Sequence, residues 1–452
     1  MKRIDATQGS VTKQIFLYTI PLILSTILQN FFNVADKAVL GNMAGTTAVA
    51  SIAATGTISL LIINGAAGLS TGTAIVLARF VGAGDAKNIR ATVDTALITA
   101  AAFGLIVAVA GFFLTPVFLT ATGCPATCYE GAMLYMRITL AAAPATLLYN
   151  YGSAILRSFG DTQRPLIYVT VAGVVNVVLN VILCLVLPQK VMAVAIATVA
   201  SKVISTVLVV VRIFRTEEAA KTTLSALRFD FSAFVRILRF GVPASISSLV
   251  HPMGNLQITA AINSFGADAI AGHSAAVSVE NFVQAFVTGF GSSAMTFIGQ
   301  NIGAKKVDRV KKSLWLCMGY STIIAGSLGV LTYLTGEFWI GIIVGRTAEV
   351  AISYGMLRLF YVIQFVFLYA ISNVLVSALK AFGYPMLTSL TNIFFNLGFR
   401  VFWMSVVYPR NSQFSTIMFC FTVSWFLNLV FYAIFAMAVY IRYVKTGKCR
   451  KI

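Results

Sequence analysis

Apolar residues form long runs along the whole chain, and short polar connections separate the runs. Each run is about 20 residues long, the length that a helix needs to cross the hydrocarbon core of a membrane. The pattern predicts about twelve membrane-spanning helices, near residues 13–36, 46–73, 92–115, 130–155, 163–187, 190–213, 233–262, 270–298, 312–333, 350–378, 386–408 and 414–441. We therefore expect an all-α integral membrane protein.

Composition supports a membrane protein. Of 452 residues, 58% are hydrophobic and only 10% are charged, whereas a soluble domain keeps roughly a quarter of its residues charged. Most of the protein's surface must therefore face lipid.

The formal net charge of +19 has a topological explanation. Lysine and arginine, Lys380 among them, gather in alternate connections, and the opposite connections hold only Lys190, Arg346 and Arg410. Basic residues stay on the cytoplasmic side of a membrane. We predict a multi-pass protein of the cell membrane with both termini in the cytoplasm, and no nucleic-acid partner is needed to explain the charge.

The chain repeats itself. A shift of about 221 positions superimposes its halves, so that Pro21 falls near Pro243, Gly68 on Gly289 and Arg137 on Arg358. We predict an amino-terminal lobe of six spans at 1–215, a cytoplasmic linker at 216–232 and a carboxy-terminal lobe of six spans at 233–452. An even number of spans gives both lobes the same orientation, so they are related by a pseudo-two-fold axis along the membrane normal. Secondary transporters place the substrate between such repeats, and a two-lobed transporter needs no partner subunit.

Polar residues inside the first predicted span share one face. Gln29, Asn33 and Asp36 are spaced i, i+4 and i+7. A carboxylate facing lipid is costly, so we expect this face to look into the bundle or a wet cavity. Because burial favours the neutral form of a carboxyl group, Asp36 is a candidate proton carrier. Alternatively, Asp36 forms a structural ion pair with Lys37 or a polar cap at the outer helix end.

Other polar residues lie at comparable depth. In the first half these are Asn176 and Asn180 on the fifth span and Thr198 and Lys202 on the sixth. The candidates for the substrate cavity are Gln29 and Lys202 in the first half and His251, Glu280, Gln284 and Arg400 in the second half. Glu280 either forms a structural pair with Arg400 or serves proton or substrate binding. Arg137 and Arg358 are expected to anchor outer helix ends.

Motifs for other energy sources and chemistries are missing from the sequence. It contains no phosphate loop of the Gly-x-x-x-x-Gly-Lys-Ser/Thr type, so we expect no direct use of ATP. It also contains no cluster with catalytic or metal-ligand spacing. We therefore expect neither an enzyme nor a cofactor.

Several segments carry a resemblance to a known family. They are Asn33-Val34-Ala35-Asp36-Lys37-Ala38-Val39-Leu40-Gly41, Gly68-Leu69-Ser70-Thr71-Gly72, Gly82-Ala83-Gly84-Asp85, Arg157-Ser158-Phe159-Gly160-Asp161-Thr162, Gly241-Val242-Pro243 and Gly299-Gln300-Asn301-Ile302-Gly303-Ala304. In this order they resemble multidrug and toxic compound extrusion (MATE) transporters over essentially the whole chain. The resemblance implies two six-helix lobes that export organic cations or drugs by alternating access, in exchange for H⁺ or Na⁺.

The resemblance also implies roles for single residues. Asp36 matches the family's acidic position for cation coupling, with Asn33, Asn176, Asn180 and Thr198 in the same network. The family often has an aspartate where this chain has Asn180, and some branches have a glutamate where it has His251. Lys202 adds a positive charge nearby. Fewer carboxylates and an added cation favour H⁺ over Na⁺, because Na⁺ prefers clustered oxygen ligands.

Two other readings of the sequence remain open. One is a flippase for lipid-linked oligosaccharides or lipid II in the same superfamily, although such proteins usually add helices and a strongly basic central cavity. The other is a membrane-embedded enzyme or receptor, against which the internal duplication argues. The expected substrates are small cationic or amphipathic molecules, with membrane lipid as the surrounding partner.

Overall fold

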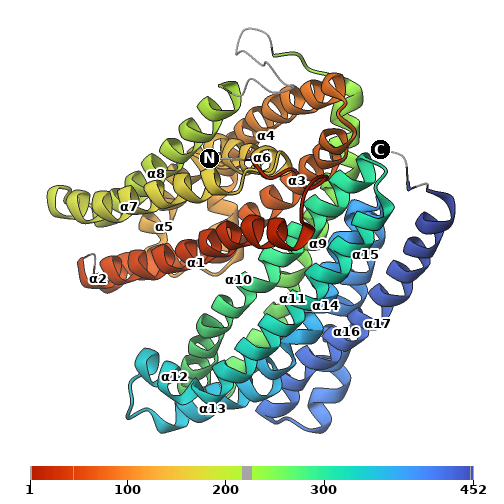
Figure 1. Cartoon of the computed structure of the whole chain (residues 1–452). Coiled ribbons are helices and arrows are strands. Elements are labelled where there is room, and N and C mark those ends of the chain that lie inside the picture. Colours follow the sequence, from red (N-terminus) through yellow and green to blue (C-terminus); the bar gives the residue numbers. More distant parts are fainter. Residues whose placement is uncertain (1–2, 44, 216–226, 448, 451–452) are drawn as a thin grey trace. The chain divides into compact units, whose positions relative to one another are not determined.

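The protein is described from a computed structural model, which covers residues 3–43, 45–215, 227–447 and 449–450. The described residues are helical, without a strand (Figure 1). The first half contains α1 (Val11–Met43), α2 (Gly45–Ala54), α3 (Gly56–Ala83), α4 (Ala86–Ala121), α5 (Ala126–Ala141), α6 (Ala143–Ser158), α7 (Gln163–Val186) and α8 (Lys190–Phe214). The second half contains α9 (Phe231–Asn263), α10 (Ala267–Gly303), α11 (Val307–Leu334), α12 (Gly336–Val344), α13 (Glu349–Tyr361), α14 (Val366–Ala381), α15 (Pro385–Asn392), α16 (Phe399–Phe402) and α17 (Phe414–Thr446).

Eleven helices of the described residues are long and apolar enough to cross a membrane, or up to twelve if the bent pair α5 and α6 is one span. The all-α membrane fold is therefore confirmed. The predicted span at 130–155 is this pair, which bends by 46°. The predicted span at 46–73 is displaced, because the helix breaks at Thr55 and the apolar span runs from Ile58 to Ala83.

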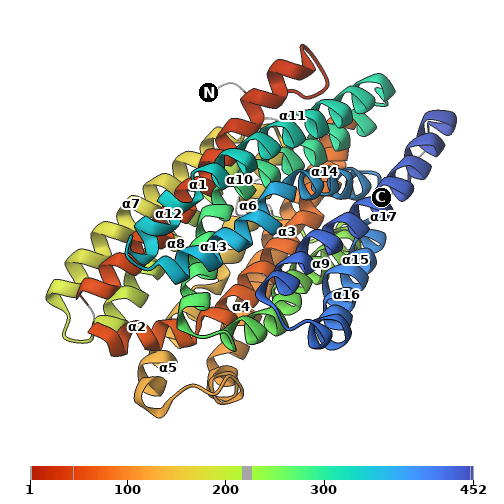
Figure 2. The same cartoon turned by 90° about the horizontal axis from the view of Figure 1, so that it is seen from below.

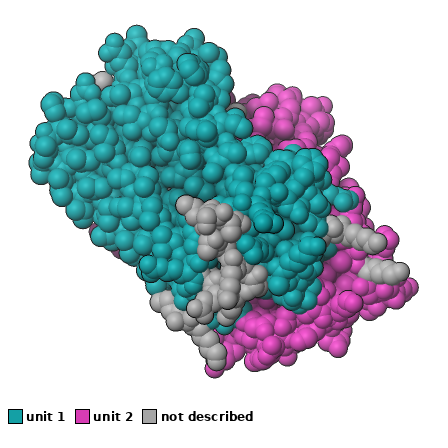
Figure 3. All heavy atoms as spheres, turned by 90° about the horizontal axis from the view of Figure 1, so that it is seen from above, with its two compact units in different colours: residues 1–4, 24–245 teal, residues 5–23, 246–452 magenta. Residues whose placement is uncertain are grey.

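The chain forms two compact units (Figure 3). Unit 1 comprises residues 1–4 and 24–245, and unit 2 comprises residues 5–23 and 246–452. These units differ from the predicted lobes 1–215 and 233–452 mainly in the beginnings of α1 and α9, which each belong to the other unit. Residues 216–226 of the predicted linker lie outside the described residues.

Each unit has its own apolar core. In unit 1, Leu77, Val93 and Tyr151 are fully buried in one cluster. In unit 2, Val287 and Leu359 are fully buried in another. Large apolar side chains also cover the outer surface, since Leu105, Phe113, Ile323 and Phe394 are among the exposed ones. An exposed surface of this kind is what a lipid-facing helix presents.

Within unit 1, α3 and α9 approach closely through small residues. A Cβ atom on Gly72 would lie 2.5 Å from the backbone nitrogen of Gly241, and one on Gly68 would lie 2.3 Å from the Cα of Ser245. Ser245 also donates a hydrogen bond of 2.9 Å to the carbonyl of Gly65. Small residues let membrane helices pack backbone against backbone, so this crossing depends on their size.

Replacing Gly72 by alanine should therefore destabilise the protein, by about 1–3 kcal/mol, as overpacking generally does. Thermal unfolding of the detergent-solubilised protein measures the effect. Gly319→Ala is the matched control, because Gly319 is also helical and a Cβ there meets nothing within 4 Å. Equal melting temperatures for the two variants would contradict the close crossing.

Candidate functional site

Residues 24–43 of α1 lie along α7 in unit 1 (Figure 1, Figure 2). The ring of Phe32 occupies the space that a side chain on Gly173 would need, with a Cβ there only 2.1 Å from the ring. Further along both helices, Met43 packs against the cluster that contains Cys184. These contacts show that the two helices run in the same direction, with Phe32 of α1 beside Gly173 of α7.

This register sets the depth of the acidic position. Asp36 follows Phe32 by four residues, about 6 Å along the helix, and Asn176 and Asn180 follow Gly173 by three and seven, about 5 and 10 Å. The backbone of Asp36 is therefore level with the two asparagines. The side chains of Asn33 and Asp36 lie outside the described part of the structure.

The two asparagines of α7 are buried and linked. Asn180 donates a hydrogen bond of 3.3 Å from its amide to the side-chain oxygen of Asn176. Thr198 is partly buried on α8, which forms a hairpin with α7 through residues 187–189. Measured from the turn at residues 187–189, the depth of Thr198 on α8 lies between the depths of Asn176 and Asn180 on α7. The predicted network of Asn176, Asn180 and Thr198 thus shares one depth in unit 1.

Gln29 and Lys202 are placed differently. Gln29 is exposed on α1, and its amide donates a hydrogen bond of 3.2 Å to the hydroxyl of Ser25. Lys202 lines a small cavity of about 40 Å³ with Thr139 and Thr146, at the bend between α5 and α6. None of the described residues that line this cavity comes from α1 or α7.

Unit 2 contains a longer polar chain. Asn392 donates to the hydroxyl of Ser247 and accepts a hydrogen bond of 2.6 Å from the amide of Asn396. Arg400 continues the chain, donating to Asn255 at 2.6 Å and to Asn396 at 3.5 Å. The contacts with Ser247 and Asn255 join the middle of α9 to the helix that runs from α15 to α16.

The contact between these helices is close because α9 has glycine there. A Cβ on Gly254 would lie 2.2 Å from the carbonyl oxygen of Asn396. The side chain of His251, one turn earlier on α9, lies outside the described part of the structure.

The ion pair of Glu280 with Arg400, one of the two roles expected for Glu280, is not found among the described residues. Glu280 of α10 instead accepts two hydrogen bonds from Arg358 of α13, at 2.9 and 2.8 Å. Both side chains are buried, so Arg358 is not the outer anchor that we expected. The physical reason is that α13 packs directly against α10. Gln284, one turn after Glu280, is partly buried on α10.

Arg358 also contacts one further helix, α17, and so links α13, α10 and α17. Its guanidinium lies 3.4 Å from Nδ1 of His273 on α10 and 3.8 Å from the sulfur of Met418 on α17. It lies 4.9 Å from the centre of the Phe421 ring, also on α17. Such a bidentate, fully surrounded pair has the geometry of a structural clamp.

Sequence reasoning missed a cavity in unit 2. It has a volume of about 200 Å³ and is enclosed by α9, α14, α15, α17 and the π-helical turn Ile393–Gly398. Lys380 of α14 lines it, together with Asn392 and Asn396 of the polar chain. The sequence signal was present, because Lys380 stands inside an apolar run, but we assigned it to the cytoplasmic basic residues.

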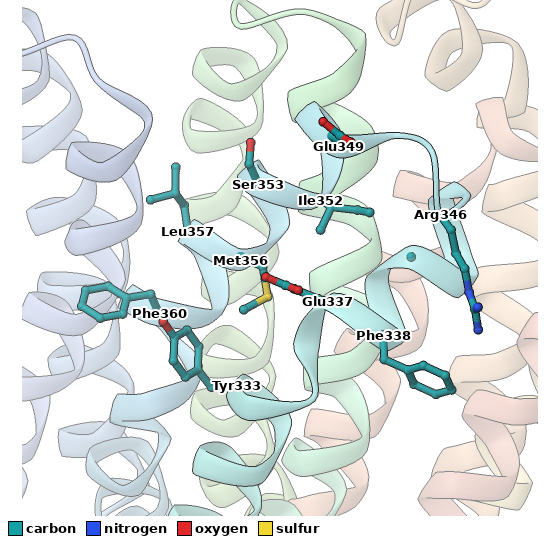
Figure 4. A pocket seen from close by; sticks show the side chains of 11 residues that line it. Tyr333, Glu337, Phe338, Arg346, Glu349, Ile352, Ser353, Met356, Leu357 and Phe360 are labelled. Atoms are coloured by element: carbon teal, nitrogen blue, oxygen red, sulfur yellow. The ribbon is translucent and has the colours of Figure 1, made fainter.

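A larger cavity, of about 780 Å³, lies elsewhere in unit 2. It is open and is formed by the end of α11 with α12 and α13, as Figure 4 shows. Phe338 and Phe360 on its walls are 52% and 43% exposed, so this hollow belongs to the outer surface at the helix ends. The enclosed polar residues described above are better placed to select a solute.

Comparisons with known proteins agree with this architecture. A family model described as MatE matches residues 21–182 and 243–403, one match in each half of the chain. The chain is 28% identical over 335 residues to a probable multidrug resistance protein of Bacillus subtilis strain 168, YoeA, covering 73% of this chain and 72% of that protein. It is 28% identical over 298 residues to an FAD transporter of Shewanella oneidensis, covering 64% of this chain and 65% of that one.

The fold has a solved counterpart. A MOP superfamily transporter from Pyrococcus furiosus superimposes with a TM-score of 0.91 over 99% of both chains, at 19% sequence identity. This likeness concerns the fold.

Proposed function

The chain belongs to the MatE family of multidrug efflux transporters, and from this premise we propose that it is an antiporter that exports small organic molecules in exchange for protons. The transported compounds are drug-like, amphipathic or cationic molecules. Alternating access of the two lobes moves them across the membrane.

The observation that carries the proposal is the register of α1 against α7. It supports a coupling site at the depth of Asp36, beside the buried amides of Asn176 and Asn180. Amide groups can donate hydrogen bonds to a carboxylate and accept one from a carboxylic acid. An aspartate in these surroundings can therefore exist in both protonation states.

The choice of H⁺ over Na⁺ follows from the same neighbours. A sodium ion needs several clustered oxygen ligands, while the two asparagines of α7 partly satisfy each other. A proton needs only the carboxyl group itself. In the proposed cycle Asp36 takes up a proton from outside as the exported compound leaves, and releases it to the cytoplasm before the next compound binds.

Reconstituted protein tests this proposal. Proteoliposomes are loaded with a fluorescent cationic dye, and efflux is followed under an imposed proton gradient and, separately, under an imposed sodium gradient. We expect efflux driven by the proton gradient alone. Efflux that needs the sodium gradient would overturn the coupling ion, and no dye movement under either gradient would favour a lipid-linked substrate.

A further inference from the structure

Lys380 is a partly buried cation without a charged partner among the described residues, and it lines the unit 2 cavity of about 200 Å³. No ion pair or hydrogen bond of its ammonium group occurs among the described contacts, and no aspartate or glutamate is among the described residues that line the cavity. A lysine inside a membrane protein is costly and normally pairs with an acid or a carbonyl group. This one faces hydroxyl and amide groups instead.

A second cation reinforces the charge of this region. Arg400 donates to Asn396, which lines the cavity, and its other partners are Asn255 and Ser424. All three partners are neutral. Two cations and neutral polar groups give this part of unit 2 a positive potential.

Asn428 supplies an unused acceptor in the same cavity. Its side chain is 3% exposed, and its amide donates a hydrogen bond of 2.9 Å to the carbonyl of Ser424. Its side-chain oxygen is buried without a hydrogen-bond partner among the described residues. A buried acceptor without a partner is costly, and a ligand that carries a donor removes this cost.

Aromatic side chains form one wall. Tyr369 and Trp425 are stacked, with ring centres 5.3 Å apart and an angle of 28° between their planes, and both line the cavity. A flat wall of this kind suits a planar ring. The volume of about 200 Å³ is smaller than the 300–1,000 Å³ or so of a site for a whole drug-sized molecule, so the cavity accommodates a part of one.

We propose that this cavity binds the acidic end, a carboxylate or phosphate, of an aromatic substrate that also carries a hydrogen-bond donor beside the acid. Lys380 pairs with the acid, Asn428 accepts from the donor, and Tyr369 with Trp425 contacts the ring. The role of this cavity as a substrate site rests on the proposed transport function. If the cavity has this role, zwitterionic or acidic aromatic compounds are among the transported substrates.

Binding of salicylate to the purified full-length protein tests the site without any gradient. Salicylate has a carboxylate with a hydroxyl beside it on a planar ring, and salicylamide is its neutral counterpart. Equilibrium dialysis with labelled compounds should show salicylate binding to the wild type, and binding roughly tenfold or more weaker for salicylamide and for Lys380→Met. Lys380→Arg should retain binding. The control Lys312→Met removes an exposed lysine of α11 and should change nothing.

Stability separates this role from a structural one. Because Lys380 has no partner among the described contacts, Lys380→Met should melt at the wild-type temperature or above it. Equal affinity of wild type and Lys380→Met for salicylate would overturn the proposal, and so would equal affinity for salicylate and salicylamide.

A second binding experiment tells whether the cavity binds the acidic group of a substrate or the phosphate of a lipid headgroup. The same binding is measured in nanodiscs of phosphatidylcholine with and without phosphatidylglycerol. Unchanged salicylate affinity supports the substrate, whereas loss of binding with the anionic lipid would assign the cavity to a lipid phosphate. Salicylate binding that persists in a protein without gradient-driven transport would refute the transport function but not the anion site.

Discussion

Asp36→Asn should abolish proton-driven efflux while leaving substrate binding in place. Asparagine has nearly the same size as aspartate and can make similar hydrogen bonds, but it cannot take up a proton. If Asp36 carries the coupled proton, the rate of efflux under an imposed proton gradient falls at least about tenfold, to the rate of liposomes without protein. A side chain that transfers a proton generally changes a rate by a factor of this size or more. Dye binding to the detergent-solubilised variant should stay within about twofold of the wild type.

The matched control is Asp85→Asn, which changes a carboxylate in the connection between α3 and α4. Asp85 caps the start of α4, accepting hydrogen bonds from the backbone and the side chain of Asn88 at 3.1 and 2.7 Å. These bonds hold the pKa of the Asp85 carboxyl below its usual value, so it stays ionised near neutral pH. Asparagine caps helices equally well, and this variant should transport like the wild type. Full efflux by Asp36→Asn would remove Asp36 from the coupling path.

Glu280→Gln should destabilise the protein by about 3–5 kcal/mol, the usual effect of removing one partner of a buried ion pair. The variant leaves the guanidinium of Arg358 without a counter-charge among His273, Met418 and Phe421. A thermal unfolding curve in detergent should show a much lower melting temperature. In the molecules that remain folded, efflux should still follow the proton gradient.

The double variant Glu280→Gln with Arg358→Met isolates the pair. Removing both charges takes away the uncompensated cation, so the double variant should be more stable than Glu280→Gln alone. Arg137→Met is the control, since Arg137 occupies the position in the first half that the repeat matches with Arg358. A Glu280→Gln protein that melts normally but has lost proton coupling would make Glu280 a coupling residue instead of a clamp.

The helices could be predicted well because the signal is carried by many residues. A run of about 20 apolar residues tolerates a few errors and still indicates a span. The break at Thr55 is marked in the sequence only by Gly56, and an isolated glycine inside an apolar run is too weak a signal to end a predicted span. The apolar run alone therefore placed this span about ten residues too early.

Side-chain partners were harder to predict than helices. The spacing of Asn176 and Asn180 was enough to predict that they are neighbours, since residues one turn apart on the same helix face each other. The partner of Glu280 depended on which of two arginines lies on the helix beside α10, and the pattern does not determine how the helices rotate. Lys380 was misjudged for a related reason. It lies in the last turn of α14, and a lysine at the end of a membrane helix usually indicates a cytoplasmic anchor. Only the packing of the helices shows that Lys380 lines a cavity.

Proton movement driven by the exported compound tests the central claim most directly. Proteoliposomes with a trapped pH indicator receive an outward gradient of the cationic dye, with no imposed gradient of protons or sodium. Because coupling between two ligands is reciprocal, we expect dye leaving the vesicles to acidify the lumen in the wild type, equally in sodium and in choline buffer, and not in Asp36→Asn. Dye efflux without any pH change, or a pH change that persists in Asp36→Asn, would contradict it.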